Sequence, residues 1–195
     1  MKLLGIAGAL RRASTNKGML RAAQRVLPAG VELTIADIAD LPLYDMDADP
    51  FGGDASGARN EAVPGWPPAV GRLREQLTAA DAVLVAVGVN NLMVPPALTN
   101  ALAWISRPET RGEERIRLLK DKPFALMGSG GGRAGADGRQ ALAHALEVLG
   151  AKVIDEAVDE AFFGGAFDLE TGDVVTDDLR ERIRSLVAAL VTRAT

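Results

Sequence analysis

The sequence predicts an α/β protein in which a five-stranded parallel sheet is covered by helices on both faces. Strand-like apolar runs alternate along the chain with segments that carry apolar residues at helical spacing. The run at 81–87 is apolar almost throughout, which is typical of a central strand buried on both faces. The 195 residues are 48% hydrophobic and 25% charged, a globular balance that fits one domain spanning residues 1–195.

The first part of the chain reads as strand, loop, helix and strand. An apolar run at 2–7 predicts the first strand, and apolar residues from Met19 to Leu27 recur at helical spacing. Alternation at 31–36 predicts the second strand. Residues 38–64 are rich in Asp, Gly and Pro, and they predict a long irregular excursion of the kind that usually covers a site or an interface.

The second part repeats the alternation of helices and strands. Proline in the first turn supports the helix at 97–106, and two aspartates support the start of the last helix. A glycine loop at 128–132 follows the fourth strand. The predicted elements are helices at 70–80, 97–106, 136–149 and 177–191, and strands at 81–87, 123–127 and 151–154.

Three unusual loops are expected to meet at one edge of this sheet. Strands that alternate with helices require right-handed crossovers, and ligands of such sheets bind outside the carboxyl ends of the strands, where the strand order reverses. The loops at 8–16, 88–95 and 128–135 each follow a predicted strand. Their convergence predicts a site for a nucleotide-like ligand.

The first of these loops suits a phosphate. It places two arginines, Arg11 and Arg12, just before Ser14, Thr15 and Asn16, whose side chains can hydrogen-bond an anion or cap the following helix. A helix N-terminus offers unpaired backbone N–H groups and a partial positive charge. The alternative for this loop is a capped helix with two solvated arginines.

Composition excludes several kinds of chemistry. The chain has no cysteine and one histidine, His144, which falls in the interior of a predicted helix. Disulfides, cysteine nucleophiles and thiolate metal sites are therefore impossible, and a serine triad would depend on His144. An enzyme with so few reactive side chains is expected to use a bound organic cofactor.

Charge and hydropathy limit the partners. The net charge is −4 and the positive residues are dispersed, so no nucleic-acid face is expected. No apolar run approaches the roughly 20 residues that a membrane span needs. A cytoplasmic protein without membrane partners is expected.

The chain resembles the NADPH-dependent FMN reductase family, flavodoxin-like proteins that include bacterial quinone and chromate reductases. Residues 8–16 look like the family's Gly-Ser-Leu-Arg-x-x-Ser-x-Asn loop, with alanine for its first serine. Residues 95–104 resemble the family's Pro-Gly-Val-Leu-Lys-Asn-Ala-Leu-Asp-Trp. Residues 128–133 resemble its glycine loop, and 41–44 match a run in its long second loop.

The resemblance implies a fold and a cofactor. The fold is a flavodoxin-like three-layer sandwich with strand order 2-1-3-4-5, and the assembly is a homodimer or homotetramer. Arg11, Ser14 and Asn16, with Thr15 beside them, would hold the FMN phosphate. The flavin ring would lie against the two later loops, at residues Gly88, Val89, Asn90, Asn91, Leu92, Ser129, Gly130 and Gly131.

The sequence departs from the family in the second loop. The family's Thr-Pro-Glu-Tyr-Asn-Gly is replaced here by residues 87–92, of which Asn91 alone is retained. Backbone N–H groups can still bond the ring's carbonyl oxygens, because that contact does not depend on side chains. Asn90 and Asn91 are alternatively turn residues, since asparagine tolerates left-handed backbone conformations.

Two hypotheses of function follow. The first is a reductase that passes hydride from NADPH or NADH through FMN to a small-molecule acceptor such as a quinone, with no side-chain acid or base needed. Arg12, Arg107 and Arg133 are equivalent candidates for contact with a 2′-phosphate. The second is a flavodoxin-like binding module with a degenerate flavin site.

Some motifs have rival interpretations. Residues 130–135 fit G-x-G-x-x-G with Asp155 about twenty residues on, which would indicate a dinucleotide-binding unit. A Rossmann unit that began there would leave too little chain for its remaining strands. Trp104 and its apolar neighbours at helical spacing are expected in the core. The acidic stretch at 155–160 is expected to be a solvated loop rather than a metal site.

Overall fold

A five-stranded parallel sheet forms the centre of the molecule, in the order β2-β1-β3-β6-β7. The computed structural model describes residues 1–52 and 58–195. The predicted order 2-1-3-4-5 is confirmed, with β6 and β7 as the fourth and fifth strands of the sheet. The strands are β1 (Lys2–Ala7), β2 (Glu32–Ala36), β3 (Ala82–Val87), β6 (Pro123–Gly130) and β7 (Lys152–Ala161).

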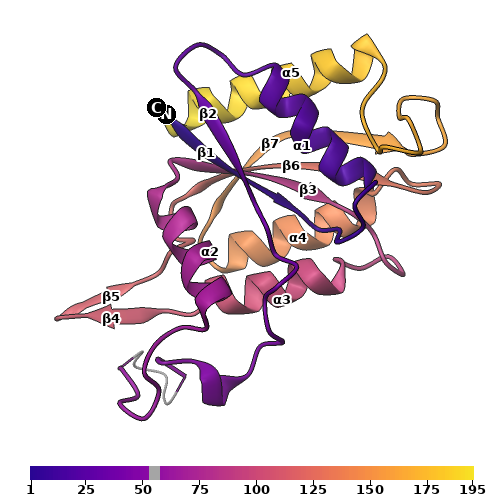
Figure 1. Ribbon diagram of the computed structural model, residues 1–195. Coiled ribbons are helices and arrows are strands. Elements are labelled where there is room, and N and C mark those ends of the chain that lie inside the picture. The colour runs from indigo at the N-terminus through magenta and orange to yellow at the C-terminus, as the bar shows by residue number, and fades with distance from the viewer. Residues whose placement is uncertain (53–57) are drawn as a thin grey trace.

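Helices cover both faces of the sheet and complete three layers (Figure 1). Helices α1 (Thr15–Arg25) and α5 (Asp177–Ala194) lie on one face. The other face is covered by α2 (Pro68–Ala79), α3 (Pro96–Ile105) and α4 (Ala136–Val148). None of the described helices is both long and apolar enough to cross a membrane.

The central strand β3 shows why the sequence produces this arrangement. Val83, Val85 and Val87 pack into the core beneath α2, α3 and α4, whereas Leu84 and Ala86 pack into the core beneath α1 and α5. Successive side chains of a strand point to opposite faces, so a strand buried on both faces must be apolar throughout. Trp104 lies in the first of these cores, as expected.

Two strands are longer than the sequence predicts. The last three residues of β6, from Gly128 to Gly130, were expected in a loop, but they pair with Asp159, Glu160 and Ala161 of β7. Strand β7 was expected at 151–154 and instead reaches Ala161, so the acidic stretch at 155–160 lies in a strand and not in a solvated loop. Neither extension could be predicted from the pattern of apolar residues, because the added residues are largely glycines in β6 and acidic residues in β7.

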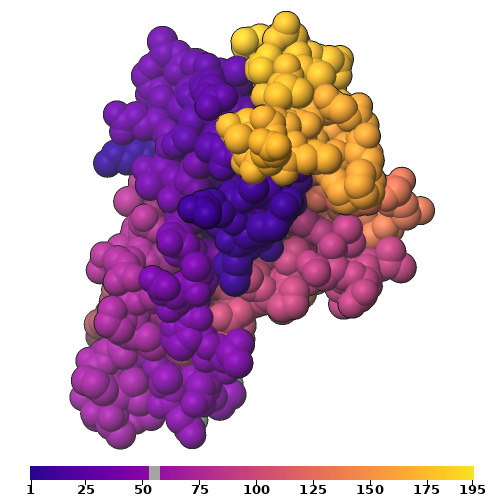
Figure 2. All heavy atoms as spheres, turned by 45° about the vertical axis from the view of Figure 1, so that its right-hand side comes forward, coloured from indigo at the N-terminus to yellow at the C-terminus, as the bar shows by residue number. Residues whose placement is uncertain are grey.

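The excursion between β2 and α2 projects at one end of the molecule (purple in Figure 2). Its one regular element among the described residues is a short 3-10 helix, η1 (Met46–Ala48). It is held on α3, because Trp104 Nε1 and Asn100 Nδ2 each donate to the Pro42 carbonyl at 2.8 Å. The Tyr44 ring also meets Trp104 edge-on, with centroids 4.8 Å apart.

An antiparallel hairpin, absent from the sequence prediction, follows α3. It consists of β4 (Glu109–Arg111) and β5 (Glu114–Ile116). A buried ion pair ties it to α2, since Arg74 Nη2 lies 3.0 Å from Glu109 Oε2. Burial lowers the pKa of Arg74 from its usual value, and the neighbouring Glu109 opposes this effect.

The segment after β7 packs against the start of α1. A Cβ at Gly18 would clash with the Gly172 carbonyl, and one at Gly172 would lie 2.7 Å from the Ser14 backbone. Gly172 also has a φ of +76°, which favours glycine. Arg21 Nε adds an ion pair with Asp173 Oδ1 at 2.6 Å. The two segments are therefore in direct backbone contact.

Candidate functional site

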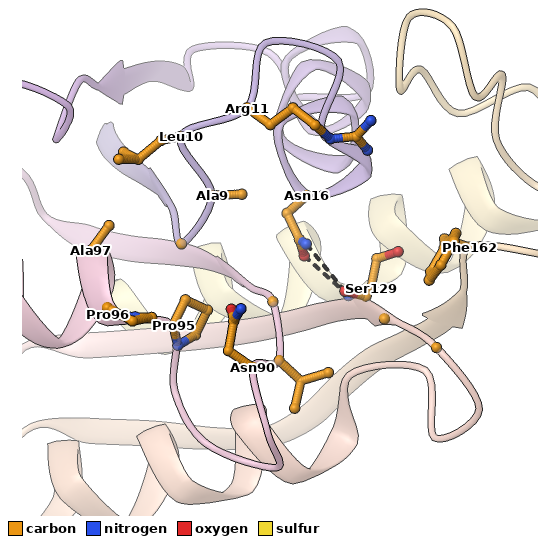
Figure 3. Close-up of a pocket in the computed structure, with 15 residues that line it drawn as sticks. Ala9, Leu10, Arg11, Asn16, Asn90, Pro95, Pro96, Ala97, Ser129 and Phe162 are labelled. Carbon is orange, nitrogen blue, oxygen red and sulfur yellow. Dashed lines mark hydrogen bonds between the residues drawn. The ribbon is translucent and has the colours of Figure 1, made fainter.

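A cavity of about 450 Å³ opens at the carboxyl ends of β1, β3 and β6, where the strand order reverses (Figure 3). This is the edge at which parallel α/β sheets bind their ligands, and the volume lies in the usual range for small-molecule sites. Its lining comes from four segments of the chain: Gly8, Ala9, Leu10, Arg11 and Asn16; Gly88, Val89, Asn90, Pro95, Pro96 and Ala97; Ser129, Gly130 and Gly131; and Phe162.

The first loop brings positive charge to this cavity. The first hydrogen bond of α1 runs from Gly18 N to the Ser14 carbonyl at 2.9 Å, so the N–H groups of Thr15, Asn16 and Lys17 precede the helical ladder. Among the described residues, none pairs with the exposed guanidinium of Arg11. Free N–H donors and a free guanidinium together suit an anion.

Two predicted residues of the first loop lie behind the cavity lining. Ser14 and Thr15 are buried, and neither is among the lining residues. Thr15 Oγ1 accepts a hydrogen bond from Ser129 Oγ at 3.0 Å. Ser14 is the N-cap residue of α1, with no hydrogen bond from its side chain to the helix.

Asn16 lines the cavity, and its amide is bonded to β6. Asn16 Nδ2 donates to the Ser129 carbonyl at 3.1 Å, and Ser129 N donates to Asn16 Oδ1 at 3.0 Å (Figure 3). A side chain in the first turn of α1 is thereby tied to the backbone of β6, 113 positions along the chain.

The second loop contributes three of its five predicted residues. Gly88, Val89 and Asn90 line the cavity, while Asn91 and Leu92 lie outside the lining. Asn90 and Met93 exchange backbone hydrogen bonds of 3.1 and 3.0 Å around a tight turn. Asn91 and Leu92 occupy its two central positions with φ values of 52° and 63°, as in a type I′ turn.

Glycines in the second and third loops allow the segments that border the cavity to pack closely on one another. A Cβ at Gly130 would lie 2.8 Å from Val89 Cγ1 and 2.8 Å from Gly135 N. A Cβ at Gly88 would lie 3.3 Å from Asn16 Nδ2. Gly130 closes β6, and α4 begins after Gly135 rather than directly after the glycine run. The strand order also differs from that of a Rossmann sheet, so the dinucleotide interpretation of 130–135 is wrong.

Sequence reasoning missed Phe162. It follows β7 directly and brings an aromatic side chain to the cavity. Its ring lies 3.8 Å from that of Phe163, centroid to centroid. Two phenylalanines directly after a strand could have indicated this contact. The sequence did not predict it because the fifth strand was expected to end at residue 154 and not at Ala161.

Three arginines were equivalent candidates for a 2′-phosphate, and the structure distinguishes their surroundings. Arg107 lies over the Tyr44 ring at 5.3 Å, outside the cavity lining. Arg133 Nε pairs with Asp137 Oδ2 at 2.8 Å. Arg12 is exposed in the first loop, one residue from the lining. His144 is an exposed residue of α4, in keeping with a helix-face position.

The strand order and the cavity at the switch point define a flavodoxin-like protein whose cavity is suited to an anionic ligand. The chain belongs to the NADPH-dependent FMN reductase family, whose sequence profile matches residues 1–162. It is 34% identical to an NAD(P)H-dependent FMN reductase of Pseudomonas aeruginosa over 97% of this chain and 93% of the relative.

Other relatives and solved structures agree with this membership. The Escherichia coli quinone reductase is 28% identical over 97% of this chain and 93% of its own. The flavoenzyme NAD(P)H:(acceptor) oxidoreductase FerB from Paracoccus denitrificans has a TM-score of 0.75 at 24% identity, covering 99% of this chain and 96% of its own. Flavodoxin 1 from Bacillus cereus has a TM-score of 0.59 at 15% identity, with 98% of each chain covered. The flavodoxin-like fold is thereby confirmed.

Proposed function

We propose that this protein is an NAD(P)H-dependent, FMN-containing reductase that passes hydride from NADPH or NADH through FMN to a small-molecule acceptor such as a quinone. The cavity at the switch point carries the proposal, because it combines free anion donors with glycine-bordered backbone. The activities in the names of the Pseudomonas aeruginosa and Escherichia coli relatives support it.

The phosphate of FMN fits the first loop. A phosphate dianion needs hydrogen-bond donors and a compensating charge, and the backbone N–H of Asn16 and the guanidinium of Arg11, both on residues that line the cavity, supply them. Lys17 Nζ donates to the Leu10 carbonyl at 2.9 Å, which holds the loop in place. In this proposal Arg11 bonds the phosphate directly, and Ser14 and Thr15 shape the loop from behind.

The flavin ring fits the part of the cavity bordered by the second and third loops. Gly88, Gly130 and Gly131 line this part of the cavity, and a Cβ at Gly131 would meet no heavy atom nearer than 4.0 Å, so its backbone is open to bond the ring's polar edge. Phe162 and Pro95 provide apolar surface at the same cavity. Asn91 and Leu92 are proposed to act on the ring only through the shape of their turn.

FMN, when bound, supplies the chemistry by accepting hydride from NAD(P)H and delivering the reducing equivalents to the acceptor. The residues of this chain bind and orient FMN and keep water away from it. The transfer of hydride requires no acid or base from them. A cavity in which Arg11 is the one charged side chain among the described lining residues suits a protein that binds its cofactor and leaves the chemistry to it.

We also propose a homodimer or homotetramer. Several large apolar side chains are exposed in or within two residues of the cavity lining, and exposed apolar surface favours association. They are Leu10, Leu92, Met93 and Phe163. Light scattering coupled to size exclusion measures the mass, and a monomer at micromolar concentration would contradict this part of the proposal.

An FMN titration followed by steady-state kinetics tests the function. We expect the purified protein to quench FMN fluorescence at stoichiometric ratio and, with oxygen excluded, to oxidise NADPH or NADH continuously only when FMN and a quinone are both present. A protein that binds no FMN would rule out the reductase and favour the binding module suggested by the altered second loop.

A further inference from the structure

We infer that the side chain of Asn16 is a positioning group that fixes the end of β6 against the first loop, and that this side chain is not a ligand of the FMN phosphate. The inference rests on the proposed function, because it assigns a role within the FMN site. It also differs from the role that the sequence resemblance gives to Asn16.

The hydrogen bonds of Asn16 carry the inference. Both polar atoms of the amide are engaged with one residue: Oδ1 accepts from Ser129 N at 3.0 Å, and Nδ2 donates to Ser129 O at 3.1 Å. The side chain is buried, with 5% of Asn16 exposed. A two-point contact of this kind fixes both the position and the orientation of the backbone that it holds.

Neighbouring groups reinforce the contact. The hydroxyl of Ser129 donates to Thr15 Oγ1 at 3.0 Å, so the first turn of α1 holds Ser129 by its backbone and by its side chain. Gly88 lies on another side of the amide, since a Cβ there would be 3.3 Å from Asn16 Nδ2. The buried amide, which follows β1 in the chain, therefore lies against the end of β6 and the first residue after β3.

This arrangement leaves little of Asn16 for a phosphate. An amide carries two N–H bonds, and one of them is directed at the Ser129 carbonyl. The amide oxygen is an acceptor and cannot bond a phosphate dianion. The residues that Asn16 does hold, from Ser129 onward, border the part of the cavity assigned to the flavin ring.

Flavins with and without phosphate distinguish the two roles. Riboflavin has the ring and the ribityl chain of FMN but no phosphate. We expect Asn16→Ala to weaken the binding of FMN and riboflavin by the same factor, roughly tenfold, because both rings meet a misplaced β6. The matched control Arg11→Ala should weaken FMN and leave riboflavin within about twofold of the wild-type value.

A spectroscopic readout makes the test independent of affinity. At saturating FMN, the visible circular dichroism of the bound flavin reports the surroundings of its ring. It should change in Asn16→Ala and stay as in the wild type in Arg11→Ala. Should Asn16→Ala not fold, Asn16→Ser serves instead, because its short hydroxyl cannot bond both atoms of Ser129.

Loss of FMN affinity alone, with riboflavin binding and the dichroism spectrum unchanged, would overturn the inference and make Asn16 a phosphate ligand. Where riboflavin binds too weakly to measure, the dichroism spectrum decides alone. Failure of the proposed function is a separate result, since it would appear in the wild-type protein as the absence of FMN binding.

Discussion

Arg139 on α4 and Asp159 on β7 form a two-pronged ion pair, with Nε 2.8 Å from Oδ1 and Nη2 2.7 Å from Oδ2. Asp159 pairs with Gly128 in the sheet, and a Cβ at Gly128 would lie 2.9 Å from Asp159 Oδ1. The ion pair thus stands directly beside the glycine run that borders the cavity, and it joins the helix that follows this run to the neighbouring strand.

Replacing Asp159 by alanine should lower the free energy of unfolding by about 1–3 kcal/mol, because it leaves a largely buried guanidinium without its carboxylate. Urea unfolding measures the change. Arg133→Ala is the matched control: it also removes an arginine pair near this loop, but Arg133 is 68% exposed, so a change within about 0.5 kcal/mol is expected. An equal decrease in the free energy of unfolding in the two variants would contradict a stabilising role for the ion pair of Arg139 and Asp159.

Arg11→Ala should weaken FMN binding by about 1–3 kcal/mol, the contribution of a charge-assisted hydrogen bond. Fluorescence titration gives the dissociation constants. Arg12→Ala removes the same charge one residue further on, outside the cavity lining, and is expected to have a clearly smaller effect. A larger loss in Arg12→Ala would show that the phosphate is bound by the other guanidinium.

Gly130→Ala should destabilise the protein by about 1–3 kcal/mol and reduce FMN affinity, because its Cβ would lie 2.8 Å from both Val89 Cγ1 and Gly135 N. Thermal unfolding and FMN titration measure the two effects. Gly132→Ala adds a Cβ with no heavy atom within 4 Å, so stability should stay within about 0.5 kcal/mol of the wild type.

Leu92→Gly should stabilise the protein. Leucine at a φ of 63° costs about 1–2 kcal/mol, whereas glycine loses about 0.5–1 kcal/mol of additional chain entropy on folding. The net gain expected is about 0.5–1 kcal/mol. The adjacent Met93→Gly is the control, and it should destabilise the protein because Met93 is not among the residues with positive φ. Chemical denaturation of both variants gives the comparison.

Tyr44→Phe should lower stability at neutral pH by about 0.5–1.5 kcal/mol, since it removes the hydrogen bond from the Tyr44 hydroxyl to Asp49 Oδ2, 3.2 Å long. Burial raises the pKa of Tyr44 above its usual value of 10.0. The unfolded chain therefore loses the phenolic proton first as pH rises, and the stability contributed by Tyr44 is lost above pH 10. Unfolding curves at increasing pH should show the difference between wild type and Tyr44→Phe shrinking in that range.

The parallel core of the fold could be predicted from the sequence because its strands are apolar and its helices are amphipathic. Strand β3 shows this most clearly, since both of its faces are buried. The hairpin β4–β5 could not be predicted in this way. Its residues are mostly polar, and it is held by the buried pair of Arg74 and Glu109, whose partners are 35 positions apart.

The candidate site was predictable to the level of its loops. Arg11, Gly88 and Gly130 line the cavity as expected, because a parallel sheet brings the carboxyl ends of its strands to one edge. The partners of individual side chains were not predictable. The bonds from Asn16 to Ser129 depend on tertiary geometry, and Phe162 depends on where β7 ends.

The contact between Gly18 and Gly172 has a consequence for how the protein can be divided. The sequence match to the family ends at residue 162, but the helix that follows the cavity's first loop packs against backbone ten residues beyond that point. A fragment that ended at residue 162 would lack α5. The buried apolar side chains of Met19 and Leu20 on α1 would then be exposed to water, and Arg21 would lose its ion pair with Asp173. The packing of α1 therefore depends on residues beyond the segment that the family profile matches.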